Sequence, residues 1–128
     1  MIIETNLGNT LPRIEFDEIK GTLLIKGRSI YNTPEKFYNE LIDYIKVYAH
    51  YPTDLTVTMD IEYFNTKTSK CFMDLFEICL KVKKKGAKLT INWLVDEDDQ
   101  DMIDAGQDYQ YLIDASFNII YHKSENEI

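Results

Sequence analysis

Residues 54–64 read Asp54-Leu55-Thr56-Val57-Thr58-Met59-Asp60-Ile61-Glu62-Tyr63-Phe64, an alternation of polar and apolar side chains as far as Tyr63. Successive side chains of a β-strand point to opposite faces, so this pattern predicts a strand with one apolar and one polar face. Residues 88–95 alternate in the same way. A parallel sheet that helices cover on both faces has strands that are apolar throughout. We therefore expect helices on one face of the sheet and an open second face. The expected apolar face of the first strand takes Leu55, Val57, Met59, Ile61 and Tyr63.

The flanking sequence supplies the remaining elements. Residues 13–17 and 22–26 alternate around a turn, which indicates a hairpin. Apolar residues recur at helical spacing in three segments, which begin near Pro34, Thr66 and Met102. A final strand is predicted at residues 117–121. The predicted order is β-β-α-β-α-β-α-β in one α/β (α+β) domain with a mixed sheet. This single domain spans residues 1–128, with its core at about 12–122 and flexible ends at 1–11 and 123–128.

The composition excludes several classes of protein. A chain of 128 residues fits one domain. Its net charge of -8 argues against binding to nucleic acid, which depends on Lys and Arg that neutralise phosphates. No apolar run approaches the roughly 20 residues that span a bilayer, and the N-terminus lacks the basic start and apolar stretch of a secretory signal. We therefore expect a cytoplasmic protein that does not insert into a membrane.

Few residues are arranged for catalysis or for metal and cofactor binding. Cys71 and Cys79 lie eight apart in one predicted helix, a rise of about 12 Å, which exceeds the roughly 7 Å between the Cα atoms of a disulfide. Both are expected to be packing residues. His50 and His122 lie beside no nucleophile and are expected at the surface. The sequence has no GxSxG, HExxH or CxxC motif and no glycine-rich phosphate loop. It predicts neither an enzyme nor a metal or cofactor site.

A cluster of hydroxyl side chains follows the strand at residues 54–64, in the segment Asn65-Thr66-Lys67-Thr68-Ser69-Lys70. The N-terminus of a helix presents unpaired backbone N–H groups and the positive end of the dipole, which together favour a negative group. A phosphate on Thr66 brings roughly -2 charge to this position, and Lys67 and Lys70 lie close in sequence. The competing interpretation is that these polar residues only cap the helix.

Acidic residues form the second candidate site. They occupy the run Asp96-Glu97-Asp98-Asp99-Gln100-Asp101 and continue at Asp104 and Asp108. Such a run suits a divalent cation or a basic partner, but it lacks the Gly and the terminal Glu of a calcium loop. Alternatively, acids in the first turn of a helix only favour its dipole. Asp60 and Glu62 form a candidate acid/base pair, although strand alternation produces such pairs freely.

Four separated blocks make the sequence similar to the SiaC-type regulatory phosphoproteins, over residues 12–120. The blocks are Gly21-Thr22-Leu23-Leu24-Ile25-Lys26-Gly27-Arg28-Ser29, then Glu62-Tyr63-Phe64-Asn65-Thr66 through Ser69-Lys70, then Asn92-Trp93, and finally Asp98-Asp99-Gln100-Asp101-Met102 with Ala105-Gly106. The resemblance implies a fold similar to the STAS domain of anti-sigma factor antagonists, in which helices lie on one side of a mixed sheet.

The resemblance also implies a function in a bacterial partner-switching pathway. In that family a kinase phosphorylates the domain and a PP2C-type phosphatase reverses the modification. The unmodified form binds and activates a diguanylate cyclase, which raises cyclic di-GMP and promotes aggregation or biofilm growth. The acceptor is the Thr of a Tyr-x-Asn-Thr motif, which here is Thr66, with Tyr63 and Asn65 beside it. Family members usually continue with Ser-Ser, and the Lys67-Thr68 found here leaves Thr68 and Ser69 as secondary acceptors.

Two other classes of function remain open from the sequence. One is a constitutive adaptor that binds a protein partner through the open sheet face, with Thr66 only capping the helix. The other is a small hydrolase or metal-dependent enzyme built around Asp60, Glu62 and the acidic run.

Overall fold

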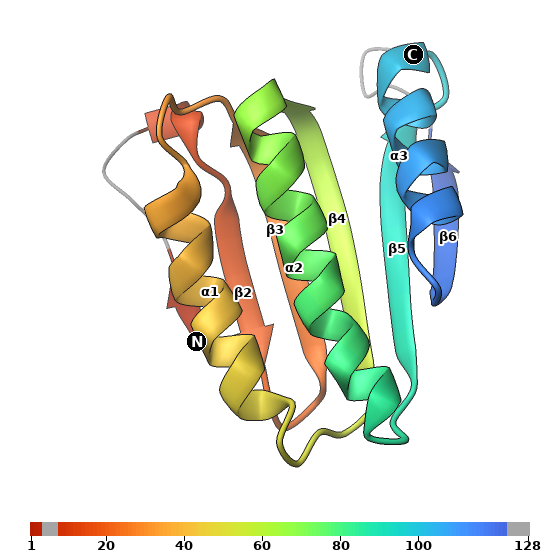
Figure 1. Cartoon of the computed structure of the whole chain (residues 1–128). Coiled ribbons are helices and arrows are strands. Elements are labelled where there is room, and N and C mark those ends of the chain that lie inside the picture. Colours follow the sequence, from red (N-terminus) through yellow and green to blue (C-terminus); the bar gives the residue numbers. More distant parts are fainter. Residues whose placement is uncertain (4–7, 123–128) are drawn as a thin grey trace.

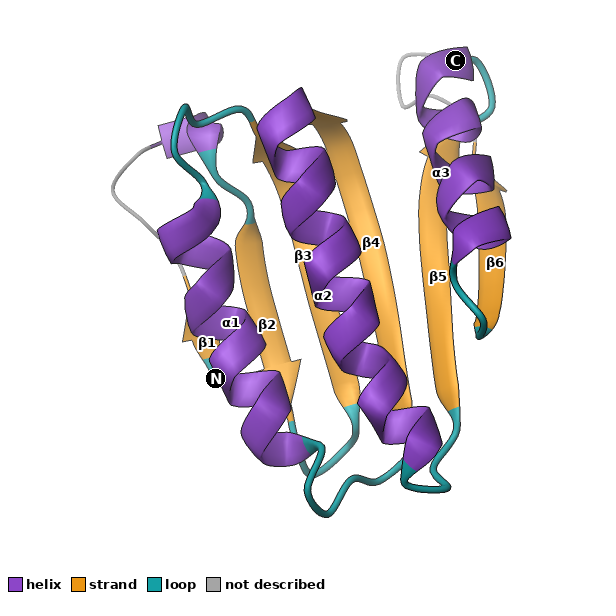
Figure 2. Cartoon of the chain, viewed as in Figure 1, coloured by secondary structure: helices purple, strands orange, loops and turns teal. Residues whose placement is uncertain are grey.

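The computed structural model describes residues 1–3 and 8–122. Six strands form one sheet, and three α-helices and a short 3₁₀ helix connect them within these ranges (Figures 1 and 2). The strands are β1 (Ile2–Ile3), β2 (Arg13–Asp17), β3 (Thr22–Ser29), β4 (Leu55–Phe64), β5 (Leu89–Asp96) and β6 (Ser116–His122). The helices are η1 (Gly8–Thr10), α1 (Glu35–Tyr48), α2 (Thr66–Lys84) and α3 (Gln100–Leu112).

Neighbouring strands of the sheet are consecutive in the chain. The pairs β1–β2 and β2–β3 are antiparallel, whereas β3 to β6 run parallel and are joined through helices. Crossovers between parallel strands are almost always right-handed, so crossovers that all advance in one direction along the sheet place their helices on one face. Figure 1 shows α1, α2 and α3 on a single face. The prediction of a mixed sheet with helices on one face is confirmed.

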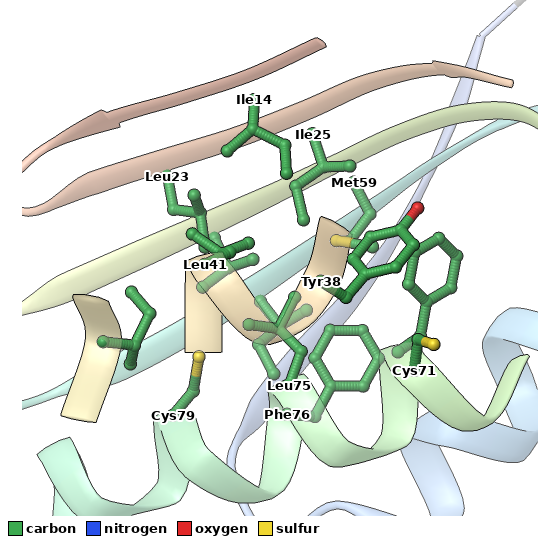
Figure 3. Close-up of a cluster of buried hydrophobic side chains, with 14 of the residues drawn as sticks. Ile14, Leu23, Ile25, Tyr38, Leu41, Met59, Cys71, Leu75, Phe76 and Cys79 are labelled. Atoms are coloured by element: carbon green, nitrogen blue, oxygen red, sulfur yellow. The ribbon is translucent and has the colours of Figure 1, made fainter. Parts of the chain in front are cut away.

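The core lies between this face and the helices. Leu55, Val57 and Met59 of β4 are at most 1% exposed, whereas Thr56 and Thr58 between them are partly exposed on the open face. Figure 3 shows how sheet side chains meet those of the helices in this cluster. The labelled residues are Ile14, Leu23, Ile25 and Met59 from the sheet, Tyr38 and Leu41 from α1, and Cys71, Leu75, Phe76 and Cys79 from α2.

The end of β4 departs from the predicted alternation. Gly27 of β3 pairs with Ile61, but the next residue pairs with Tyr63, so Glu62 is the extra residue of a β-bulge. A bulge shifts the side chains that follow it to the other face. Tyr63 is therefore 54% exposed, and the prediction that it joins the apolar face is wrong. Phe64 turns toward the core instead, with its ring centroid 5.1 Å from that of Phe72.

The N-terminal segment also differs from the prediction of a flexible end over residues 1–11. Ile2–Ile3 pair with β2 as strand β1, and Leu11 is buried against the core. β1 pairs with backbone N–H and C=O groups that would otherwise lie free at the edge of β2, and Ile3 and Leu11 gain burial. Residues 4–7 and the predicted flexible end at 123–128 lie outside the described residues.

Helix α3 approaches β5 closely because residue 106 is glycine. A Cβ atom at Gly106 would lie 2.5 Å from Cδ1 of Trp93, which is too close for any side chain. Glycine in the interior of a helix costs roughly 0.5–1 kcal/mol relative to alanine. That cost is offset by the contact with Trp93, whose side chain is fully buried and donates from Nε1 to the backbone oxygen of Met102 at 3.0 Å.

Candidate functional site

Helix α2 begins with an asparagine cap. Asn65 has an extended backbone, and its side-chain oxygen accepts a hydrogen bond from the backbone N–H of Thr68 at 2.9 Å. This bond satisfies one of the N–H groups that the first turn of a helix leaves without an intrahelical partner. The capping role expected for Asn65 is confirmed.

The other groups of Asn65 fasten this helix start to the end of β3 and the connection that follows it. Its backbone N–H donates to the oxygen of Ser29 at 3.0 Å, and its Nδ2 donates to the backbone oxygen of Tyr31 at 3.2 Å. The first turn of α2 is therefore held from two directions, along the helix and against the neighbouring strand.

Thr66 is the first residue of α2, and it is exposed. It lies at the edge of a cavity of about 410 Å³ between the start of α2 and α3. The cavity is lined by Phe64, Asn65, Thr66, Ser69, Ala105, Asp108, Tyr109 and Leu112. The Thr66 hydroxyl is thus within reach of a modifying enzyme and beside a space that can receive partner side chains.

The two other hydroxyls of this segment have different surroundings. Thr68 is 0% exposed, and its hydroxyl lies 2.7 Å from that of Ser29. Its burial argues against Thr68 as an acceptor in the folded protein. Ser69 is half-buried, and its hydroxyl lies 3.2 Å from that of Tyr109, which donates to the Ser69 backbone oxygen at 2.9 Å. Burial raises the pKa of Tyr109, and its hydrogen bond with Ser69 opposes this shift.

The two lysines are near Thr66 in sequence but point elsewhere. Lys67 Nζ donates to the backbone oxygen of Asn32 at 2.9 Å. Lys70 Nζ lies 3.8 Å from a carboxylate oxygen of Asp74, in an exposed pair one helical turn apart. Both lysines line a second cavity, of about 180 Å³, between α1 and α2. Their charge still adds to the positive potential of a first turn that contains no acidic residue.

The acidic run proves to be a helix start. The Asp99 side chain caps α3 by accepting from the N–H of Met102 at 3.2 Å, and Asp96 accepts from the N–H of Asp98 at 2.9 Å. Within residues 1–3 and 8–122, no group of three or more His, Cys, Asp or Glu side chains is placed to hold a metal ion. Asp96 and Asp99 therefore fix the geometry of the loop and of the helix start.

The remaining sequence candidates are exposed or partly exposed. Asp60 pairs with Lys26 across the open face at 3.9 Å, while Glu62 sits in the bulge and is exposed. His50 and His122 are both exposed, as predicted.

Both cysteines are free and buried in the one helix α2. Burial, followed by the nearby Glu35 and Asp74 carboxylates, raises the pKa of the Cys71 thiol to about 11. Burial alone raises the pKa of Cys79 to about 12. Such thiols stay protonated at neutral pH and are poor nucleophiles, which agrees with the packing role predicted for them.

Sequence reasoning did not find the residues that hold this site from outside α2. Ser29 contacts the first turn from β3 and itself accepts from Tyr38 of α1, and Tyr109 contacts the first turn from α3. One feature of the sequence could have indicated the role of Ser29: it is a polar residue at the end of a strand whose core-facing side chains are otherwise apolar. The pairing itself joins residues 39 positions apart, which no local pattern reveals.

These observations define a mixed α/β domain with three helices on one face and an exposed threonine at the capped start of its longest helix. In the part of the chain that the structure describes, no helix has the length and apolarity to cross a membrane. The chain belongs to the SiaC family of regulatory phosphoproteins, because the sequence model of that family matches residues 5–122. Among curated proteins, none matches the sequence significantly.

Three solved structures from Pseudomonas aeruginosa have the same fold. One is SiaC in the crystal structure of the diguanylate cyclase SiaD with its activator SiaC; it has a TM-score of 0.86 and 19% identity, covering 95% of this chain and 99% of that one. SiaC by itself gives a TM-score of 0.83 at 18% identity, with the same coverage. Apo-SiaC gives a TM-score of 0.77 at 17% identity, and the match covers 97% of this chain and 99% of that one.

Proposed function

We propose that this chain is a non-enzymatic bacterial switch that is reversibly phosphorylated on Thr66. A protein kinase adds the phosphate, a PP2C-type phosphatase removes it, and the unmodified chain binds and activates a diguanylate cyclase. The pathway consumes ATP and GTP, so we place the protein in the cytoplasm. Its output is a change in cyclic di-GMP that controls aggregation or biofilm growth.

The observation that carries the proposal is the exposed Thr66 beside the 410 Å³ cavity, at a helix start that is capped by the uncharged Asn65. Membership of the SiaC family of regulatory phosphoproteins and the fold of the SiaC–SiaD complex support it. Ser69 is the secondary acceptor, because its side chain is only half-buried. Thr68 is not proposed as an acceptor, because its side chain is fully buried.

The mechanism follows from what a dianion does to this cavity. Phe64 and Leu112 make part of its lining apolar, so a partner that fills the cavity removes the Thr66 side chain from water. A phosphate resists this desolvation and also takes up space. Shifting a partner from almost wholly bound to almost wholly free needs about 5.5 kcal/mol of differential affinity. Interaction with the helix dipole supplies only about 0.3–1 kcal/mol, so steric exclusion and desolvation must provide most of the effect.

Affinity capture from the native host tests the proposal. The Thr66→Ala chain should retain a diguanylate cyclase, and the Thr66→Asp chain should lose it. Ser116→Asp is the matched control, since it adds the same charge at an exposed position at the other end of the parallel strands. Purified cyclase should then form cyclic di-GMP faster with Thr66→Ala than with Thr66→Asp. Equal capture by both Thr66 variants would contradict the switch.

Mass spectrometry of the native protein separates the switch from a constitutive adaptor. The switch predicts phosphate on Thr66, whereas the adaptor predicts none. An Asn92→Arg substitution on the open sheet face, where Asn92 bonds Asn118 at 3.0 Å, should spare cyclase binding if the cavity is the docking site. A constitutive adaptor that uses the open face should lose its partner with this variant.

A further inference from the structure

A chain of three buried hydroxyls joins α1, β3 and the first turn of α2. The Tyr38 hydroxyl donates to Ser29 Oγ at 2.7 Å, and the Thr68 hydroxyl donates to the Ser29 backbone oxygen at 3.1 Å. Because Thr68 has one hydroxyl hydrogen, the 2.7 Å contact between the Ser29 and Thr68 hydroxyls must use the hydrogen of Ser29. The hydrogen bonds therefore run in one direction. Tyr38 donates to the Ser29 hydroxyl, Ser29 donates to the Thr68 hydroxyl, and Thr68 donates to the Ser29 backbone oxygen.

Because the three hydroxyls are buried, each of them needs a hydrogen-bond partner within the protein. Tyr38, Ser29 and Thr68 are each 0% exposed, and burial raises the pKa of the Tyr38 hydroxyl well above its ordinary value. A buried hydroxyl without a partner is costly, and each of the three donors here has one acceptor. Loss of the Ser29 or the Thr68 hydroxyl therefore leaves the hydroxyl that donates to it without an acceptor.

Ser29 is the residue on which the bonds converge. Its side chain contacts Tyr38 and Thr68, and its backbone oxygen accepts from both Thr68 and the N–H of Asn65. It thus holds the cap of α2 and the third residue of the helix at once. Thr66, which lies between them, projects away from this anchor into solvent.

We infer that Ser29 is the positioning residue of the Thr66 site, because through Thr68 and Asn65 it fixes the first turn of α2 so that Thr66 is displayed and Thr68 is withheld. This inference rests on the proposed function for its consequence, but the positioning itself is measurable without any partner. Replacing Ser29 or Thr68 by a residue without a hydroxyl should loosen this turn more than the rest of the helix.

Amide hydrogen exchange followed by NMR measures that local effect. In Ser29→Ala and Thr68→Val, we expect the amides of Thr68 and Ser69 to exchange about tenfold faster than the global loss of stability explains. The amides of Leu75 and Phe76 should change only by that global amount. Thr68→Ser should restore protection because it keeps the hydroxyl, and Tyr38→Phe serves as the milder variant if Ser29→Ala does not fold.

Two exchange results would overturn the inference. One is a uniform increase along α2, which is what a merely structural residue produces. The other is a Thr68→Ser chain that exchanges as fast as Thr68→Val.

Phosphate occupancy in the native host supplies the functional readout. Occupancy of Thr66, measured by mass spectrometry, should fall in Ser29→Ala and Thr68→Val and recover in Thr68→Ser. Wild-type occupancy in Thr68→Val would overturn positioning of the modification site. Absence of phosphate from the wild-type chain would instead refute the proposed function, and the exchange experiment would still decide whether Ser29 holds the turn.

Discussion

Helices α2 and α3 begin in the same way but carry opposite charge at their starts. Each follows a strand of the parallel part of the sheet, β4 or β5, and is capped by one side-chain oxygen. The N–H of Thr68 donates to Asn65 at 2.9 Å, and the N–H of Met102 donates to Asp99 at 3.2 Å. The α3 cap is an acid and Asp101 adds another in its first turn, whereas the first turn of α2 contains none.

Each first turn is also attached to the sheet by a buried hydrogen bond. In α2 it runs from the Thr68 hydroxyl to the Ser29 oxygen at 3.1 Å, and in α3 from Trp93 Nε1 to the Met102 oxygen at 3.0 Å. Both starts are thus attached to the sheet, but their dipoles are balanced differently. Fixed carboxylates already balance the dipole of α3, whereas α2 keeps a positive end that an added phosphate can use.

The largest expected effect concerns the anchor of α3. Trp93→Phe removes the bond to the Met102 oxygen and leaves a void among Phe64, Phe72, Tyr109 and Phe117, whose rings surround the indole. We expect a loss of about 2–4 kcal/mol in the free energy of unfolding, measured by urea denaturation. A loss below about 1 kcal/mol would mean that α3 does not depend on this anchor.

The anchor of α2 should cost less to remove because its side chain is smaller. Thr68→Val keeps the shape but leaves the Ser29 hydroxyl without an acceptor, so we expect a loss of about 1–3 kcal/mol. Thr68→Ser is the matched control, since it keeps the hydroxyl and removes only a methyl group. If both variants lost the same amount, packing rather than hydrogen bonding would hold the turn.

Much of this comparison was predictable from the sequence, because it depends on local patterns. Alternation in residues 54–64 and 88–95 gave the one-sided sheet, and Asn65 and the acids near Asp99 gave both helix starts. Such features follow from residues that are neighbours along the chain, where strand and helix periods act directly.

The features that could not be predicted depend on contacts between segments that are distant in the sequence. Tyr63 was expected in the core, but the bulge at Glu62 is set by pairing with Gly27 and Arg28 of another strand. The hydroxyl contact between Ser29 and Thr68 likewise exists only after β3 and α2 are brought together. The alternation of side chains in one strand does not show where pairing with a neighbouring strand will place a bulge.

Removing each cap tests how alike the two starts are. Asp99→Ala should destabilise the protein by about 0.5–1 kcal/mol, and Asn65→Ala by about 1–2 kcal/mol. The difference arises because Asn65 also donates to the backbone oxygen of Tyr31, which would lose its partner. Urea denaturation of both variants under the same conditions gives the comparison. An Asp99→Ala loss equal to or greater than that of Asn65→Ala would show that the added bond to Tyr31 contributes nothing.

The smallest expected effect distinguishes the two starts by its sign. Thr66→Asp should stabilise the protein by about 0.3–1 kcal/mol, because it places a carboxylate at the uncompensated end of α2. Asp101→Asn should destabilise it by a similar amount, since it removes such a charge from α3, and about 1 M salt should reduce both changes. A Thr66→Asp chain that unfolds at higher urea than wild type and yet fails to bind the cyclase would show that a charge at Thr66 blocks the surface without disturbing the fold. If Thr66→Asp were instead destabilising, loss of binding by that variant would have to be attributed to a disordered helix start and not to the charge at Thr66.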